Sequence, residues 1–347
     1  MKLYPIRFEP IYLDKVWGGR TLEHLGRQLP AGSGDGPPPA IGEAWEIADL
    51  GSTSGSGAGG SAVRSRVAEG PLAGRTLHEL VDEYGELLAG TTPMTESGNF
   101  PLLIKYLDAR EHLSVQVHPS PRYAREHPEA HLKSEAWYVV EAEPDAAIYK
   151  GVHDGVTPEQ FRAAIDNDTV EDLMIRIPVQ PGDCHYLPSG TCHALGAGLL
   201  VAEVQTPSDT TFRVYDWGRP RELHIEQALQ CIQFGPAHAG QYEPGTMIHR
   251  EGHAVETLVH CEHFRMEKII IDHPQSFPVV NNHQVRIAMV LEGEGVITCN
   301  GAMPKVRFQR GDTLLIPAEL EDPVAHFDKP ASFLNVTIPS AMDHVIA

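Results

Sequence analysis

Two histidines, a glutamine and a glutamate have the residue types and spacing of a metal site. Gln116 and His118 are two residues apart, so on a β-strand both side chains point to the same face. Glu135 can point to that face from an adjoining strand, and His193 from a strand that follows a Pro-Gly turn. Together they offer O, N, O and N donors, which suit zinc or a similar divalent ion. We therefore expect one divalent ion per chain, with an open coordination position for water or a substrate oxygen.

The segment that carries His193 resembles a known metal-binding motif. It reads Gly182-x5-Pro188-x-Gly190-x2-His193, which matches the second sequence motif of the cupin superfamily at these four anchor residues. In that motif the proline and glycine form a tight turn between two strands, and the next strand points its histidine into a β-barrel. The resemblance implies that His193 binds a metal as a neutral imidazole.

A longer series of motifs resembles the mannose-6-phosphate isomerases, in their shorter bacterial form. The matching segments are 16–19 (VWGG), 41–46 (IGEAWE), 113–119 (LSVQVHP), 133–138 (KSEAWY), 188–194 (PSGTCHA) and 208–216 (SDTTFRVYD). The resemblance covers roughly residues 5 to 235 and, more loosely, the remainder. It implies a zinc-dependent interconversion of mannose 6-phosphate and fructose 6-phosphate. It further implies a metal site of Gln116, His118, Glu135 and His193, with Arg213 as the active-site arginine.

Such an isomerisation moves a proton between two sugar carbons through an enediolate, so it needs a base and groups that stabilise an oxyanion. Lys133, Glu203 and Asp209 are the candidates for the base, and the sequence does not choose among them. Arg213 could hold the substrate oxygens or the phosphate by paired hydrogen bonds. Ser114, on the same strand face as Gln116, could donate its hydroxyl, and Trp17 is either a wall or lid of the substrate pocket or a core residue.

The elements that position these residues read as mainly β. Short β-branched or aromatic runs alternate with Gly and Pro turns, as in an antiparallel sandwich or barrel. Helices are expected at 76–88 and from Thr157, where Thr-x-x-Glu and Thr-Pro-x-Gln form capping boxes, and at 225–232.

A repeated heptapeptide pattern predicts two β units. Residues 182–188 and 311–317 share Gly-Asp, four residues and Pro at an offset of 129. We therefore predict two cupin-like (jelly-roll) β-barrel units with helical insertions: a metal-binding catalytic unit at 1–235 and a degenerate unit at 236–347, with the boundary near 235–244. The second copy continues as Ala318-Glu319-Leu320, without the glycine and histidine of the first, so we expect it to lack metal ligands.

Composition narrows the partners. The 347 residues include 27 Lys and Arg against 47 Asp and Glu, a net charge of −20, which argues against nucleic acid and anionic membrane surfaces. The amino-terminal MKLYPIRFEPIYLDK lacks the apolar stretch of a signal peptide, no stretch approaches a membrane span, and the five cysteines form no C-x-x-C pair. We expect a cytoplasmic monomer or small homo-oligomer whose partner is a small sugar phosphate.

Two other functions remain open at this stage. The chain could be a non-catalytic sugar-binding or regulatory cupin, or an iron-dependent oxygenase on the same fold. The glutamine among the ligands and the basic motifs favour a phosphorylated sugar over dioxygen.

Overall fold

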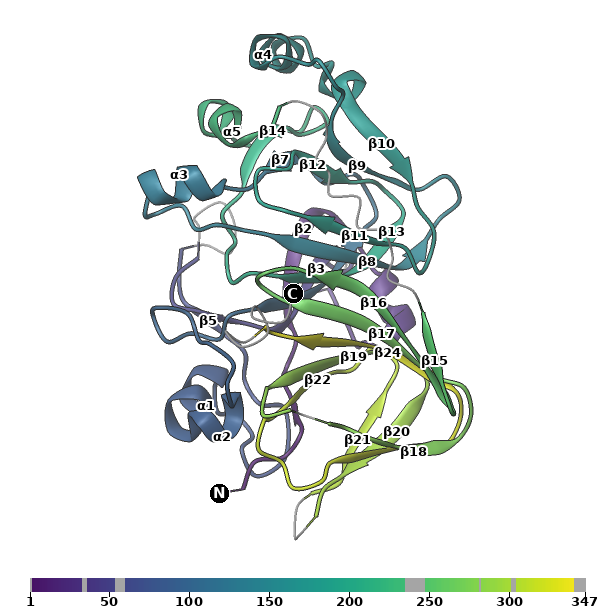
Figure 1. The fold of residues 1–347 in the computed structure, drawn as a ribbon. Helices are drawn as coiled ribbons and strands as arrows, with labels where there is room; N and C mark the ends of the chain where they lie inside the picture. Colours follow the sequence, from purple (N-terminus) through teal and green to yellow (C-terminus); the bar gives the residue numbers. More distant parts are fainter. Residues whose placement is uncertain are drawn as a thin grey trace.

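The computed structural model describes residues 2–32, 36–53, 60–234, 247–280, 282–300 and 304–339. Their strands form four large antiparallel sheets, stacked one above another as Figure 1 shows, and a two-stranded ribbon of β4 (Asp49–Leu50) and β5 (Val63–Arg64). The prediction of a mainly β fold is confirmed. Within the described residues, no helix combines the length and the apolar composition needed to cross a membrane.

The first pair of sheets carries the residues of the predicted site. The six-stranded sheet has the order β11 (Cys184–Leu187), β8 (Glu135–Ala142), β13 (Leu199–Gln205), β6 (Leu103–Ala109), β2 (Ile11–Gly19) and β3 (Ile41–Ile47). The five-stranded sheet has the order β10 (Met174–Pro178), β9 (Ala147–Val152), β12 (His193–Leu195), β7 (Val115–Val117) and β14 (Phe212–Tyr215). Trp137 and Val201 of the former pack with Ile148 and Leu195 of the latter, so the two sheets share one apolar core.

The second pair of sheets repeats this strand order. The seven-stranded sheet has the order β1 (Ile6–Arg7), β22 (Thr313–Ile316), β19 (Arg286–Glu292), β24 (Ala331–Thr337), β17 (Arg265–Ile271), β16 (His253–His260) and β15 (Ile248–Arg250). The four-stranded sheet has the order β18 (Gln275–Pro278), β23 (Val324–Phe327), β20 (Glu294–Thr298) and β21 (Val306–Gln309). The two large sheets match strand for strand, with β22-β19-β24-β17 in the places of β11-β8-β13-β6. The two smaller sheets match in the same way, with β21-β20-β23-β18 in the places of β10-β9-β12-β7.

The two predicted barrels are not seen as closed structures, because none of the sheets in the described part of the chain closes on itself. The six- and seven-stranded sheets instead pack on each other through a large apolar core, with Tyr106 and Ala202 on one side and Met266 and Leu334 on the other. The predicted boundary near 235–244 lies outside the described residues, so the division at 235 stays a prediction. The sequence did not reveal that β1, at the amino terminus, pairs with β22.

The helices confirm the predicted caps. Before α1 (Leu77–Tyr84), Thr76 accepts a hydrogen bond from the Glu79 backbone, and the reciprocal bond completes the box. The predicted helix at 76–88 is broken at Gly85, whose φ of 46° is left-handed, and resumes as α2 (Glu86–Ala89).

The remaining helices are mostly associated with the five-stranded sheet. Residues of α3 (Pro121–Glu126), α4 (Pro158–Asp166) and α5 (Ile225–Cys231) pack with residues of that sheet. Short 3-10 helices are η1 (Thr21–Leu25) and η2 (Val170–Leu173). These three helices cover one face of the five-stranded sheet, and the residues of the predicted site lie on its other face.

Candidate active site

Three buried side chains meet between the first two sheets. His118 directly follows β7, Glu135 begins β8 and His193 begins β12, and β12 pairs with β7 through His193 and Gln116. One ligand atom from each of the three lies within 4.8 Å of the others, so the cluster could hold a metal ion. All three residues are at most 1% exposed. Strand pairing therefore brings together residues that are up to 75 positions apart in the chain.

Backbone carbonyls fix the orientation of both imidazoles. Nδ1 of His118 lies 2.9 Å from the Thr210 carbonyl oxygen, and Nδ1 of His193 lies 2.8 Å from that of Thr191. Each Nδ1 therefore donates, which leaves each Nε2 with a lone pair. Burial, followed by the charge of Lys133, lowers the pKa of His118 to about 3, so this imidazole is neutral at neutral pH.

These lone pairs face the carboxylate of Glu135. Nε2 of His118 lies 3.4 Å from Glu135 Oε2, and Nε2 of His193 lies 3.2 Å from Oε1. His118 Nε2 and Glu135 Oε1 are buried without a hydrogen-bond partner within the described residues, while Glu135 Oε2 forms an ion pair with Lys133. Because acceptors face acceptors, a cation among them would satisfy all three groups. The residues present thus fit a divalent metal ion, with two imidazole nitrogens and a carboxylate as donors.

Gln116, the predicted fourth ligand, lies beside this cluster. Its Nε2 atom is 3.3 Å from His193 Nε2, and its Oε1 atom accepts a hydrogen bond of 3.4 Å from Ser114 Oγ. Its amide group is therefore close enough to the triad to contribute to the same centre.

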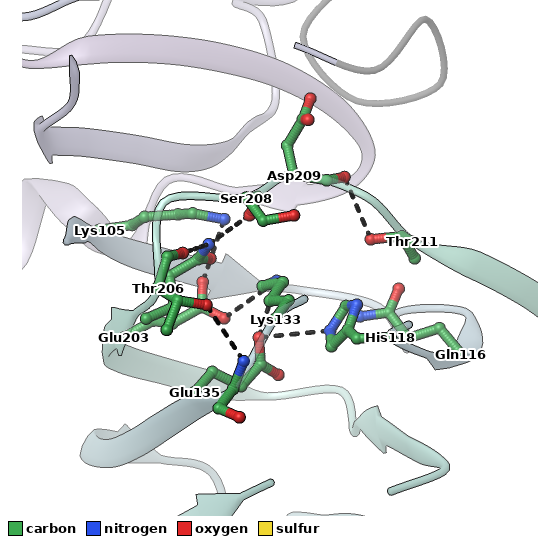
Figure 2. Close-up of polar contacts among 12 residues, drawn as sticks. Lys105, Gln116, His118, Lys133, Glu135, Glu203, Thr206, Ser208, Asp209 and Thr211 are labelled. Atoms are coloured by element: carbon green, nitrogen blue, oxygen red, sulfur yellow. Dashed lines mark hydrogen bonds and ion pairs between the residues drawn. The ribbon is translucent and has the colours of Figure 1, made fainter. Parts of the chain in front are cut away.

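A row of alternating charges leads away from Glu135. Lys133 Nζ is 2.7 Å from Glu135 Oε2 and 3.7 Å from Glu203 Oε1, and Figure 2 shows this group beside His118. Burial alone would raise the pKa of Glu135, but Lys133, His118 and His193 together outweigh burial and hold that pKa well below its usual range. For Glu203, burial dominates over Lys105 and Lys133, and its pKa is raised. The two carboxyls thus differ in proton affinity although one lysine touches both.

The row continues through residues that the sequence analysis did not assign to the site. Lys105 Nζ is 3.2 Å from Glu203 Oε2 and 3.5 Å from Glu43 Oε2, and Lys15 Nζ is 3.1 Å from Glu43 Oε1. Burial would lower the pKa of Lys105, but Glu203 and Glu43 outweigh it and raise the pKa. A signal was present: Lys105 interrupts the otherwise apolar run Leu-Leu-Ile-Lys-Tyr-Leu, and every residue of β6 is buried.

A cavity of about 90 Å³ lies along this row. Its lining includes seven of the ten predicted site residues, namely Trp17, Ser114, Gln116, Lys133, Glu203, Asp209 and Arg213. The other three are the buried triad. Five lysines and arginines border it against three carboxylates, so it is a local positive region in a chain of charge −20.

Arg213 is the arginine best placed to meet a ligand in this cavity. Its backbone pairs with Gln116, and its Nη1 donates to the Glu222 carbonyl oxygen at 2.7 Å, while Nε is buried without a partner among the described residues. By contrast, Arg219 and Arg221 both donate to Asp216. Burial, followed by repulsion from Arg221, lowers the pKa of Arg213. A bound oxyanion would accept a hydrogen bond from Nε and would offset the repulsion between Arg213 and Arg221.

Comparison with known proteins agrees with the resemblance in sequence. Residues 7–154 match the family model of the phosphomannose isomerase type I catalytic domain. The mannose-6-phosphate isomerase ManA of Bacillus subtilis is 33% identical over 327 residues, covering 91% of this chain and 94% of its own. The mannose-6-phosphate isomerase of Streptococcus mutans is 35% identical over 322 residues, covering 89% and 92%.

The fold agrees as well. The crystal structure of the mannose 6-phosphate isomerase from Bacillus subtilis superposes with a TM-score of 0.81 at 32% identity, covering 96% of this chain and 99% of that one. From its motifs, its site and these similarities over nearly its whole length, the chain belongs to the mannose-6-phosphate isomerase family.

Proposed function

We propose that this chain is a zinc-dependent aldose-ketose isomerase that interconverts mannose 6-phosphate and fructose 6-phosphate. One observation carries the proposal: a buried His118–Glu135–His193 cluster adjoins a cavity in which cations outnumber carboxylates. The cluster suits a divalent ion, and the excess of cations suits a phosphorylated substrate. The names of the relatives point to the same reaction.

The ion would be held by His118, Glu135 and His193, with Gln116 as the fourth donor once its amide, whose Nε2 lies toward His193, turns to present Oε1. Nitrogen and oxygen donors in this number favour zinc over calcium or magnesium, which take oxygen ligands almost alone. When bound, such an ion supplies Lewis acidity that lowers the energy of negative charge on the sugar oxygens.

Glu203 is the base that we propose for the carbon-bound proton. It borders the cavity, and Trp137 Nε1 donates to its Oε1 at 3.2 Å, which fixes the carboxyl. Its raised pKa makes it a better proton acceptor than an ordinary glutamate. Lys133, 3.7 Å from Glu203, would stabilise the carboxylate and pass a proton to substrate oxygen. Asp209, which also borders the cavity, is the remaining candidate.

The substrate would be oriented by its charged end and by its enediolate oxygens. Arg213 lines one part of the cavity and can take phosphate or enediolate oxygens by paired hydrogen bonds, and Arg221, which is held by Asp216, adds positive charge beside it. Ser114 would donate to a sugar oxygen, and Trp17, which is buried in the same apolar cluster as Trp137, would form the wall.

We further propose how the chain is divided into units and where in the cell it works. The repeated strand order supports two cupin-like jelly-roll units, 1–235 with the metal and 236–347 without metal ligands. The five cysteines are all free thiols, as is usual for a cytoplasmic protein. A monomer or small homo-oligomer remains our prediction.

A coupled isomerase assay at saturating zinc tests the function. We expect the purified chain to convert mannose 6-phosphate to fructose 6-phosphate, with solvent deuterium entering the sugar at the isomerised carbons. Binding of the sugar phosphate without turnover would instead indicate a non-catalytic sugar-binding or regulatory cupin. Oxygen uptake without isomerisation would indicate an oxygenase.

A further inference from the structure

A second and larger cavity lies between the second pair of sheets. It measures about 380 Å³, and its lining comes from both the seven-stranded and the four-stranded sheet. Phe277, Phe308, Phe327 and Phe333 supply aromatic walls. This size and an apolar lining with a few polar groups are typical of small-molecule sites. Nothing in the proposed isomerase reaction uses this cavity.

Arg286 of this cavity has the same position in its sheet as the metal-site residue Glu135. Glu135 pairs with Leu187 on one side and Gln205 on the other. Arg286 pairs with Ile316 and Thr337 in the same way, and Leu187 and Ile316 are matching residues of the repeated heptapeptides. A carboxylate in the first pair of sheets is therefore replaced by a guanidinium in the second, which excludes a metal ion at this position.

Neighbouring positions differ in a similar way. Two residues beyond Glu135, Trp137 pairs with Glu203, which pairs with Lys105. In the second sheet, Ala288 pairs with Asn335, which pairs with Glu267. Alanine in place of tryptophan leaves space, so the second cavity is the larger one. Glutamate in place of lysine reverses a second charge.

Within the described residues, the half-buried Arg286 makes no ion pair with a carboxylate, whereas the neighbouring Arg265 does. Glu267 is occupied by Arg265 at 2.6 Å and by the Asn335 amide at 3.0 Å. Arg286 Nη1 donates only to the neutral Asn335 Oδ1, at 3.2 Å, and its Nε is buried without a partner within the described residues. A half-buried guanidinium whose Nε is fully buried and lacks an anion is costly, and a bound anion would reduce that cost.

We propose that this cavity binds an organic monocarboxylate with an aromatic or branched apolar body. The carboxylate would pair with Arg286, and the apolar body would lie among the phenylalanines. Glu267, close to the same asparagine, disfavours a phosphate dianion more strongly than a single carboxylate. Exposed Arg250 and Arg265 border the cavity and would attract anions to it, although the chain as a whole is acidic.

The test uses the full-length, zinc-loaded protein with excess mannose 6-phosphate present, so that the first cavity is blocked. The probe is 3-phenylpropanoate, and its neutral amide serves as the uncharged control; binding is followed by calorimetry. We expect one acid to bind per chain, at least about tenfold more tightly than the amide. Absence of saturable binding of the acid up to about 5 mM, or equal affinity for acid and amide, would overturn the proposal.

Two variants locate the binding. Arg286→Met should weaken the acid about tenfold or more and leave the amide unchanged, whereas Ala288→Trp should exclude both by filling the space. Arg307→Met, on an exposed position of β21, removes an equal charge away from the cavity and should change neither. Thermal unfolding checks that each variant is folded. If Arg286→Met does not fold, the proposal is tested by whether Ala288→Trp abolishes binding of the acid and by whether the unmodified protein binds the acid more tightly than the amide. Unchanged acid binding in both folded variants would contradict the proposal.

Discussion

The two cavities occupy matching places in two pairs of sheets, but the side chains at matching strand positions beside them carry opposite charges. At one position the first has Glu135 and the second Arg286; at another the first has Lys105 and the second Glu267. The strand order and register are the same, so the backbone alone determines where these side chains point. Residue type then determines whether the position can hold a cation or pair with an anion, so the difference in function that we propose lies in the side chains and not in the fold.

The largest expected effect is loss of Glu135, the carboxylate of the proposed metal site. Glu135→Gln should lower kcat/KM about 1,000-fold, because the lost Lewis acidity is worth several kcal/mol, and the bound metal per chain should fall with it. Elemental analysis and the coupled assay measure both quantities. Glu294→Gln, an exposed carboxylate in the second pair of sheets, is the matched control. Full activity of Glu135→Gln would remove the contrast between the two cavities.

Arg213 should matter next. Arg213→Ala should lower kcat/KM about 100-fold or more with metal content unchanged, because one strong donor to the substrate oxyanion is lost. Arg213→Lys should recover only part of the activity, since lysine keeps the charge but not the paired donors. Steady-state kinetics with elemental analysis check this. Near-normal turnover of the alanine variant would exclude Arg213 from the reaction.

The charged row should also stabilise the first pair of sheets in a pH-dependent way. Burial alone would raise the pKa of Glu43, but Lys105 and Lys15 outweigh it and lower the pKa to about 2, from an ordinary 4.5. The contribution of the carboxylate is therefore complete above about pH 4.5 and is lost as the pH falls towards 2.

Glu43→Gln tests that contribution. It should lower the free energy of unfolding by about 2 kcal/mol at pH 7, because Lys15 loses its carboxylate while Lys105 keeps Glu203. Urea unfolding from pH 7 to pH 3 should show the difference from the unmodified protein shrinking below pH 4.5. If the difference in free energy of unfolding grew on acidification, the lowered pKa that we assign to Glu43 would be contradicted.

The smallest effect concerns the empty space of the second cavity. Ala288→Leu should raise the free energy of unfolding by up to about 1 kcal/mol, because the larger side chain buries more apolar surface in the second cavity. Ala288 holds the position at which the first sheet has the much larger Trp137. Thermal unfolding without added carboxylate measures it. A clear loss of stability would show that there is no room at this position.

The sequence alone located much of the site because its signals are local. The i and i+2 spacing of Gln116 and His118 places them on one face, and the turn before His193 belongs to a recognisable motif. The Thr76 and Thr157 capping boxes likewise identified two helices. Gly85 carried a signal for the break between α1 and α2, but the apolar spacing across it favoured one continuous helix.

Features that depend on long-range strand pairing could not be found in this way. Lys105 reaches Glu203 and Glu43 only because β6 lies beside β13 and β3. The match between Glu135 and Arg286 is also hidden, because outside one heptapeptide the paired residues differ in size and charge. The pairing of β1 with β22 has no local signal, since two residues are too few to define a register.

Metal reconstitution tests the central claim most directly. The chain is stripped of metal with a chelator, zinc is added back in steps, and isomerase activity is plotted against bound zinc per chain. We predict negligible activity without metal and a linear rise that stops at one ion per chain. Full mannose 6-phosphate isomerase activity in the metal-free chain would contradict the account.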